Sequence, residues 1–248
     1  MIKVLNDRVV VIGAEGSSNI TGVLVKNSVI VVDTSLFAEK ARKVKELLDD
    51  FFKKPIEMVV NTHYHPDHTF GNVAFEGAKI LASELTKSFM EVFDERYLSK
   101  LPPIEKIVTP NFTFDEEYED KNLFIKRLGG HTLDSSIVFF KQEKLLVAGD
   151  LIFNGFHAEI VADSDLDEWL SALKFIEDMR PAWIVPGHGE VATLECLKAM
   201  QRYLVKMKRL LDGALNLHDA MSDENFSKRK FPELFSWSLE NLLHQRRS

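Results

Sequence analysis

The segment NTHYHPDHTFGN, residues 61–72, gathers three histidines and one aspartate within six consecutive positions. These are His63, His65, Asp67 and His68. Burying several titratable side chains together is costly unless a charged group binds them. Neutral imidazole and carboxylate are the usual ligands of a divalent transition metal. Pro66 stiffens the turn and limits the directions in which the ligands point. The segment therefore predicts a metal-binding loop.

A single metal does not comfortably use all four side chains of so short a loop. The adjacent Asp67 and His68 point in different directions from His63 and His65, so two metals sharing the loop is the simpler geometry. Two metals need further ligands, and three candidates each follow an apolar run and a small residue: His131 in RLGGH, Asp150 in LLVAGD and His188 in VPGHG. Strand ends at one edge of two packed sheets can converge on one cleft, where we expect these ligands to meet.

The chain around these motifs alternates strand-like and helix-like patterns. β-branched runs predict strands at 9–13, 22–26, 28–33, 56–61, 78–83, 122–128, 135–141, 144–150 and 182–185. Apolar residues at helical spacing predict helices at 38–52, 84–100 and 166–179, and a loop with two proline breaks at 101–112. Two strand-rich blocks with helices predict an α/β fold of two packed sheets with helices outside. We expect this domain to span residues 1–190, with a helical extension at 191–248 packed on it.

Composition narrows the classes of partner. The chain has 248 residues, a net charge of −7 and no basic block, so we expect no nucleic-acid partner. Its apolar runs are too short to span a bilayer, and its first residues lack the pattern of a signal peptide. The single cysteine, Cys196, excludes an internal disulfide. These features predict a cytoplasmic protein that acts on a small molecule.

The four motifs in this order resemble the metallo-β-lactamase superfamily: HxHxDH at 63–68, then GGHT, AGD and PGHG, within about residues 20–190. The resemblance implies an αββα sandwich of two mixed β-sheets with a dinuclear zinc cleft at one edge. It assigns His63, His65 and His131 to one zinc, and Asp67, His68 and His188 to the other. Asp150 would bridge the two. Asp33, at the end of VIVVD, would orient the loop unless it is an ordinary turn residue.

The resemblance also implies a chemistry. Two zinc ions share a bridging hydroxide that attacks a carbonyl, and Asp67 orients that nucleophile and carries its proton. His65 stands where the flavodiiron relatives have glutamate, which favours hydrolysis over redox chemistry. Asp150 stands where many β-lactamases have cysteine or a non-ligand residue. We therefore expect a hydrolase similar to glyoxalase II and the lactonases, which cleaves an ester, a thioester or a lactone. The glutathione-binding pattern of glyoxalase II is not recognisable.

Other functions stay open at this point. Persulfide dioxygenases resemble the same fold and bind one iron, here through His63, His131 and Asp150. A β-lactamase-like amide hydrolase is a further alternative, and a metal-holding scaffold without turnover is a third. Iron or manganese are alternatives to zinc as the native metal.

Residues beside the motifs are candidates for substrate contact and for support of the ligands. We expect substrate contacts from the residues around the first motif and after Asp150, namely Tyr64, Phe153, Asn154, Phe156 and His157; for the two phenylalanines a core position is an equal alternative. Thr132 and Asp134 either support His131 by hydrogen bonds or only shape the turn. The aromatic residues after Phe226 predict a helical piece that either roofs the cleft or forms a homodimer contact.

Overall fold

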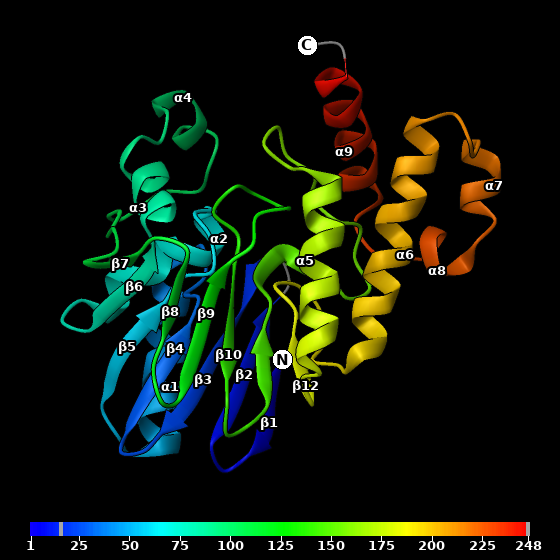
Figure 1. Cartoon of the computed structure of the whole chain (residues 1–248). Coiled ribbons are helices and arrows are strands. Elements are labelled where there is room, and N and C mark those ends of the chain that lie inside the picture. Colours follow the sequence, from blue (N-terminus) through cyan, green and yellow to red (C-terminus); the bar gives the residue numbers. More distant parts are fainter. Residues whose placement is uncertain (15–16, 247–248) are drawn as a thin grey trace.

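Two mixed β-sheets lie face to face, and helices cover the outer face of each (Figure 1). The computed structural model describes residues 1–14 and 17–246. The first sheet has the order β1-β2-β3-β4-β5-β6-β7, with antiparallel pairing from β1 to β4 and parallel pairing from β4 to β7. Its strands are β1 Ile2–Asn6, β2 Val9–Ala14, β3 Ser17–Val25, β4 Ser28–Val32, β5 Ile56–Val60, β6 Lys79–Ser83 and β7 Phe112–Phe114.

The second sheet has the order β12-β11-β10-β9-β8 and is antiparallel except for the parallel pair of β11 and β12. Its strands are β8 Glu117–Glu119, β9 Leu123–Arg127, β10 Ser136–Phe140, β11 Leu145–Val147 and β12 Trp183–Val185. The predicted α/β sandwich with αββα layers is therefore confirmed.

The helices lie outside the sheets and continue to the C-terminal end of the described residues. They are α1 Ala38–Phe52, α2 Pro66–Thr69, α3 Glu84–Glu91, α4 Glu95–Leu98, α5 Leu166–Met179, α6 Leu194–Leu211, α7 Leu217–Met221, α8 Glu224–Ser227 and α9 Pro232–Gln245, with short 3-10 helices η1 Phe70–Phe75 and η2 Gly149–Leu151. Among the described residues, no helix combines the length and the apolar character that a membrane crossing requires.

Strand β4 shows how the layers are built, because it is buried on both faces. Val29 and Val31 face outward, where α1 packs on the first sheet. Ile30 and Val32 face inward and meet the second sheet. This alternation follows from the two-residue period of a strand, and a run of apolar residues is what a strand covered on both faces requires.

The C-terminal helices share the core on the outer side of the second sheet. Helices α5 and α6 pack there together, and the core extends to residues of α8 and α9. Between them lies an aromatic cluster in which the ring of Phe226 stacks on Tyr203 and contacts Phe235 edge to face. His157 completes this cluster, with its ring 5.4 Å from those of Phe226 and Phe235. Residues of α6, α8 and α9 therefore share one hydrophobic core with the outer side of the second sheet.

Several local expectations were wrong. The single helix expected at 84–100 is two helices, α3 and α4, with a break at Val92 to Asp94. Asp94 is the N-cap of α4, because its carboxylate accepts hydrogen bonds from the backbone N–H groups of Arg96 and Tyr97. The sequence did not indicate the edge strands β1, β7 and β8, which are short or half exposed.

Helix α9 provides a matched test of this packing. Phe235→Ala should lower the free energy of unfolding by about 3 kcal/mol, because the ring is buried among other core side chains. Trp237→Ala, two residues along the same helix, should lower it by about 1 kcal/mol or less, because this side chain is 40% exposed. Chemical denaturation followed by circular dichroism measures both. Equal losses for the two variants would contradict the packing described for α9.

Candidate metal centre

The loop after β5 carries four of the predicted ligands at the carboxyl edge of the parallel strands. Pro66 occupies the first turn of α2, where its missing N–H group costs no hydrogen bond. The side chains of Asn61 and Asn72 donate hydrogen bonds to each other across the loop. Thr69 Oγ1 donates to the carbonyl oxygen of His65. The loop is therefore held by its own polar groups, and its imidazoles are free to face a shared space.

Four side chains form a first group of ligand atoms: His63, His65, His131 and Asp150. His131 Nε2 lies 3.2 Å from His65 Nδ1 and 3.6 Å from Asp150 Oδ2. His63 Nε2 lies 3.9 Å from the same carboxylate oxygen. All four side chains are buried, and they come from three loops that are far apart in the sequence.

Asp67, His68 and His188 form a second group beside the first. Asp67 Oδ2 lies 3.3 Å from His188 Nε2 and 3.7 Å from His68 Nε2. Asp150 reaches this group with its other oxygen, since Oδ1 lies 3.1 Å from His68 Nε2 and 3.4 Å from His188 Nε2. One carboxylate thus presents one oxygen to each group.

The geometry of these atoms fits two metal ions better than a hydrogen-bond network. His63 Nε2, His68 Nε2 and both carboxylate oxygens of Asp150 are buried and make no hydrogen bond within the described chain. Such unpaired groups are rare and costly in protein interiors. Ligand atoms about 2.1 Å from a tetrahedral zinc lie about 3.4 Å from one another. The separations given above, 3.2–3.9 Å in the first group and 3.3–3.7 Å in the second, are close to that value, and all ligand atoms of a group lie within 4.8 Å of one another.

Asp33 supports the loop from beneath. Its Oδ1 accepts a hydrogen bond from the backbone N–H of Thr62, and its Oδ2 accepts one from Thr62 Oγ1. The same Oδ2 lies 2.8 Å from His68 Nδ1. Thr62 Oγ1 also lies 3.1 Å from His63 Nδ1. Asp33 therefore fixes the orientation of one imidazole in each group, leaving the Nε2 atoms to face Asp150.

His131 is positioned in a similar way by the second half of the chain. Its Nδ1 lies 3.0 Å from the carbonyl oxygen of Glu159, an acceptor that holds the ring with Nε2 toward the first group. Thr132 Oγ1 donates to Asp134 Oδ1, and Thr86 Oγ1 donates to Asp134 Oδ2. Burial raises the pKa of Asp134 to about 6, although these two hydroxyl groups lower it. Asp134 thus ties the loop after His131 to the start of α3.

Burial keeps imidazoles of the first group in the form that binds metals. Desolvation, helped by the charges of His68 and His65, lowers the pKa of His63 well below its ordinary value. Burial also lowers the pKa of His131 to about 3. Both rings are neutral at pH 7, and a neutral ring nitrogen is the donor that a metal requires.

Carboxylates dominate the electrostatics of the second group. Burial lowers the pKa of His188, but Asp150 and Asp67 outweigh it and raise the pKa to about 10. Burial raises the pKa of Asp67, but His68 and His188 outweigh it and lower the pKa to about 2. The protein's own charges therefore favour positive charge at this position, which either a proton or a metal ion supplies.

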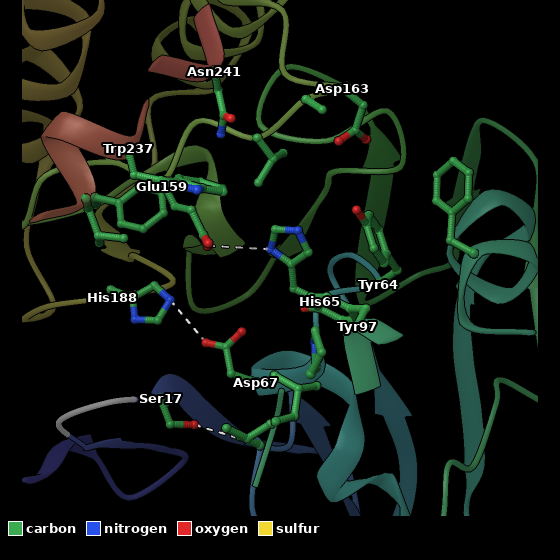
Figure 2. A pocket seen from close by; sticks show the side chains of 18 of the residues that line it. Ser17, Tyr64, His65, Asp67, Tyr97, Glu159, Asp163, His188, Trp237 and Asn241 are labelled. Carbon is green, nitrogen blue, oxygen red and sulfur yellow. Dashed lines mark hydrogen bonds and ion pairs between the residues drawn. The ribbon is translucent and has the colours of Figure 1, made fainter. Parts of the chain in front are cut away.

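A cavity of about 860 Å³ opens above the two groups (Figure 2). Asp67, His65 and His188 lie at its floor, and Tyr64, Phe153 and Phe156 are among its lining residues. The ring of Phe153 stacks on that of His188, with centroids 5.3 Å apart and planes 6° apart. The structure thus brings three of the five expected substrate contacts to the cavity, and Phe153 also packs against a ligand.

The other two expected substrate contacts, Asn154 and His157, are not among the residues that line the cavity. His157 is buried in the aromatic cluster with Tyr203, where its Nδ1 lies 3.2 Å from the tyrosine hydroxyl. The backbone of Phe156 pairs with that of Lys230, just before α9. This pairing turns the side chain of Phe156 toward the cavity and that of His157 away from it. Asn154 donates its side-chain N–H to the carbonyl oxygen of Glu190 instead.

Several residues at the cavity were not foreseen. Glu159 places its Oε2 3.9 Å from His65 Nδ1. No motif in the sequence after Asp150 marks this position. Phe89 comes from α3, Tyr97 from α4 and Phe93 from the break between them. Trp237 and its neighbours on α9 were expected to cover the cleft or form a dimer contact, and here they line the cavity (Figure 2).

Known proteins are similar to this chain in sequence. The family model of the metallo-β-lactamase superfamily matches residues 13–188. A metallo-β-lactamase type 2 from Bacillus cereus is 27% identical over 186 residues, which cover 68% of this chain and 68% of that protein. Another from Elizabethkingia meningoseptica is 23% identical over 209 residues, covering 79% and 80%. The alpha subunit of a 2,4-dinitroanisole O-demethylase from a Nocardioides species is 29% identical over 64% of this chain and 49% of that protein.

Solved structures share the architecture. A metallo-β-lactamase from Pontibacter korlensis superimposes with a TM-score of 0.64 at 23% identity, covering 83% of this chain and 98% of that one. The DIM-1 metallo-β-lactamase superimposes with a TM-score of 0.67 at 18% identity, covering 83% and 96%. At these identities the likeness supports the fold alone. Since the family model covers more than half of the residues, including all seven clustered ligands, the chain belongs to the metallo-β-lactamase superfamily.

Proposed function

We propose that the protein is a hydrolase with two zinc ions that cleaves an ester, a thioester or a lactone. This proposal rests on the position of the Asp150 carboxylate. Its two oxygens face two separate sets of ligand atoms and have no hydrogen-bond donor of their own. A carboxylate in that position is suited to neutralise two cations at once.

The seven ligands divide between the two ions as their distances suggest. His63, His65 and His131 would hold one, Asp67, His68 and His188 the other, and Asp150 would touch both. When bound, two such ions supply a water made acidic enough to attack at neutral pH and a Lewis acid that polarises the substrate carbonyl. Among the described residues no cysteine belongs to this cluster, and Cys196 lies buried in α6.

Asp67 is the chain's own candidate for handling a proton. Its side chain is 23% exposed and lies between the ligand cluster and the cavity, whereas Asp150 is buried. The hydroxyl of Ser18 donates a hydrogen bond to the carbonyl oxygen of Asp67 and fixes its backbone. We propose that this carboxylate orients the attacking water and accepts its proton.

The relatives named metallo-β-lactamase type 2 make amide hydrolysis the second candidate function. A similarity to glyoxalase II would instead favour thioesters. In either case we propose that the protein acts on a small molecule in the cytoplasm, with α9 as the roof of the cavity rather than as a dimer contact, because Trp237 lies within the lining.

Metal analysis tests the proposal and separates it from oxygen chemistry. Protein purified without added metal should contain about two zinc ions per chain and hydrolyse carbonyl substrates without consuming oxygen. Mass spectrometry of the metals and an oxygen electrode with a persulfide substrate measure this. One iron per chain together with oxygen uptake would instead establish the mononuclear dioxygenase.

Removing the shared carboxylate should separate the two groups. Asp150→Ala should lose at least one metal ion per chain and nearly all hydrolysis, because it removes the carboxylate that faces both groups of ligands. Asp223→Ala, which removes the N-cap carboxylate of α8, is the control and should keep both metals. Full metal content with near-normal turnover in Asp150→Ala would refute the dinuclear assignment.

The support from Asp33 should be measurable as metal affinity. The residue has a φ of 60°, which asparagine tolerates, so Asp33→Asn preserves the backbone while weakening the hydrogen bonds to Thr62 and His68. We expect the affinity for zinc to fall by about 10-fold or more in competition with a chelator. An unchanged affinity would show that the loop keeps its shape without this carboxylate.

A further inference from the structure

The cavity above the metal centre has two aromatic walls. One comes from α3, α4 and the break between them, where Phe93 and Tyr97 stack with planes 16° apart, beside Tyr64 of the metal-binding loop. The other comes from the segment that opens α9, where Phe231 stacks on Phe156 with planes 18° apart. Trp237 adds a third large ring to this side. The cavity therefore offers several aromatic faces to the part of a substrate remote from the scissile bond.

Apart from the ligand histidines, the charged residues of the lining are all acidic. Besides the ligand Asp67, four carboxylates line the cavity, and within the residues that the structure describes the lining contains no lysine or arginine. The four are Asp94, Glu159, Asp163 and Glu233. Among the described residues none of the four forms an ion pair with a lysine or an arginine. Glu159 lies near the ligand His65, and Asp94 accepts hydrogen bonds from the backbone N–H groups of Arg96 and Tyr97.

These carboxylates are distributed around the aromatic walls. Asp94 belongs to the α3–α4 side and Glu233 to α9, so each wall has an acid. Glu159 reaches the metal-ligand groups, with Oε2 3.9 Å from His65 Nδ1 and a side chain that is 36% exposed. Figure 2 shows Glu159 beside Trp237, facing His65. Lys230 contacts the ring of Phe156, with Nζ 5.4 Å from its centroid, but it is not part of the lining.

We infer that this cavity selects substrates with a bulky apolar body that carries a positive charge, such as an amine or a quaternary ammonium group, and disfavours anionic ones. The inference rests on the proposed hydrolase function and specifies its substrate class. Aromatic faces attract organic cations through the negative potential above the ring. Unpaired carboxylates in a cavity with low-dielectric walls reinforce that attraction and repel anions. Both effects act on the remote group and leave the bond to be cleaved at the metal centre.

A substrate series that varies only in remote charge tests the inference. Hexanoate esters of one alcohol, with a trimethylammonium, a tert-butyl or a sulfonate group on the far carbon, share the same scissile bond and nearly the same shape. We expect kcat/KM to fall in that order, by about 10-fold or more between the ammonium and the sulfonate. Equal values, or the highest value for the sulfonate, would overturn the inference.

Variants assign the preference to named residues. Glu159→Gln and Glu233→Gln keep the shape of each side chain and remove one charge, so each should reduce the ratio of kcat/KM between the ammonium and sulfonate esters several-fold. Glu57→Gln is the control, because Glu57 is exposed on β5 and is not among the lining residues. Metal content and thermal stability should not change in any of the three. A ratio that is the same in all variants would exclude these carboxylates as its source.

Binding measurements keep the inference testable even if hydrolysis is not observed. Non-hydrolysable hexyl methyl ethers with the same three end groups can be titrated against the full chain by calorimetry, both with zinc and after treatment with a chelator. The ammonium ether should bind most tightly and the sulfonate ether least tightly in both forms. That order without turnover of any ester would refute the proposed hydrolase and sustain the inference. Turnover with the reverse order of binding would do the opposite.

Discussion

The carboxylate of Asp150 is the constraint on which the rest of the site depends. It is buried, makes no hydrogen bond, and turns one oxygen toward His131 and His63 and the other toward His68 and His188. An unpaired carboxylate in a protein interior is stable only if positive charge lies beside it. The imidazoles around it are themselves oriented by Asp33 and by backbone carbonyl groups, so their free nitrogen atoms converge on this one side chain.

The two-sheet architecture is what brings these groups together. Parallel pairing of β4, β5 and β6 in one sheet, and of β11 and β12 in the other, places strand ends from distant parts of the sequence at one edge. The approach of these ends leaves little room. A side chain at Gly187 would collide with Asp150, and the carbonyl oxygen of Gly187 also accepts a hydrogen bond from Asn19. The position of the Asp150 carboxylate thus requires a glycine at 187, the first glycine of the PGHG motif.

The sequence was sufficient for those parts of the structure that depend on local pattern. Short apolar runs followed by His63, Asp150 or His188 identify buried strands and the side chains at their ends, and the structure brings all seven expected ligand residues into two adjacent groups. His157 is turned away from the cavity because neighbouring residues of an extended segment face opposite sides, and only the pairing with the segment before α9 decides which residue faces the cavity. Glu159 reaches the cavity through tertiary packing alone, which leaves no local pattern in the sequence. For Trp237 the aromatic residues of the C-terminal segment predicted either a roof over the cleft or a dimer contact, and only the packing of α9 brings the ring to the cavity.

Anomalous X-ray diffraction from crystals of the zinc-loaded protein tests the central claim most directly, because it locates the metals without reference to any substrate. We expect two zinc peaks in each chain, one beside His63, His65 and His131 and the other beside Asp67, His68 and His188, with Asp150 in contact with both. A single peak that Asp150 touches with one oxygen, or a cluster whose side chains bind one another and no metal, would contradict it.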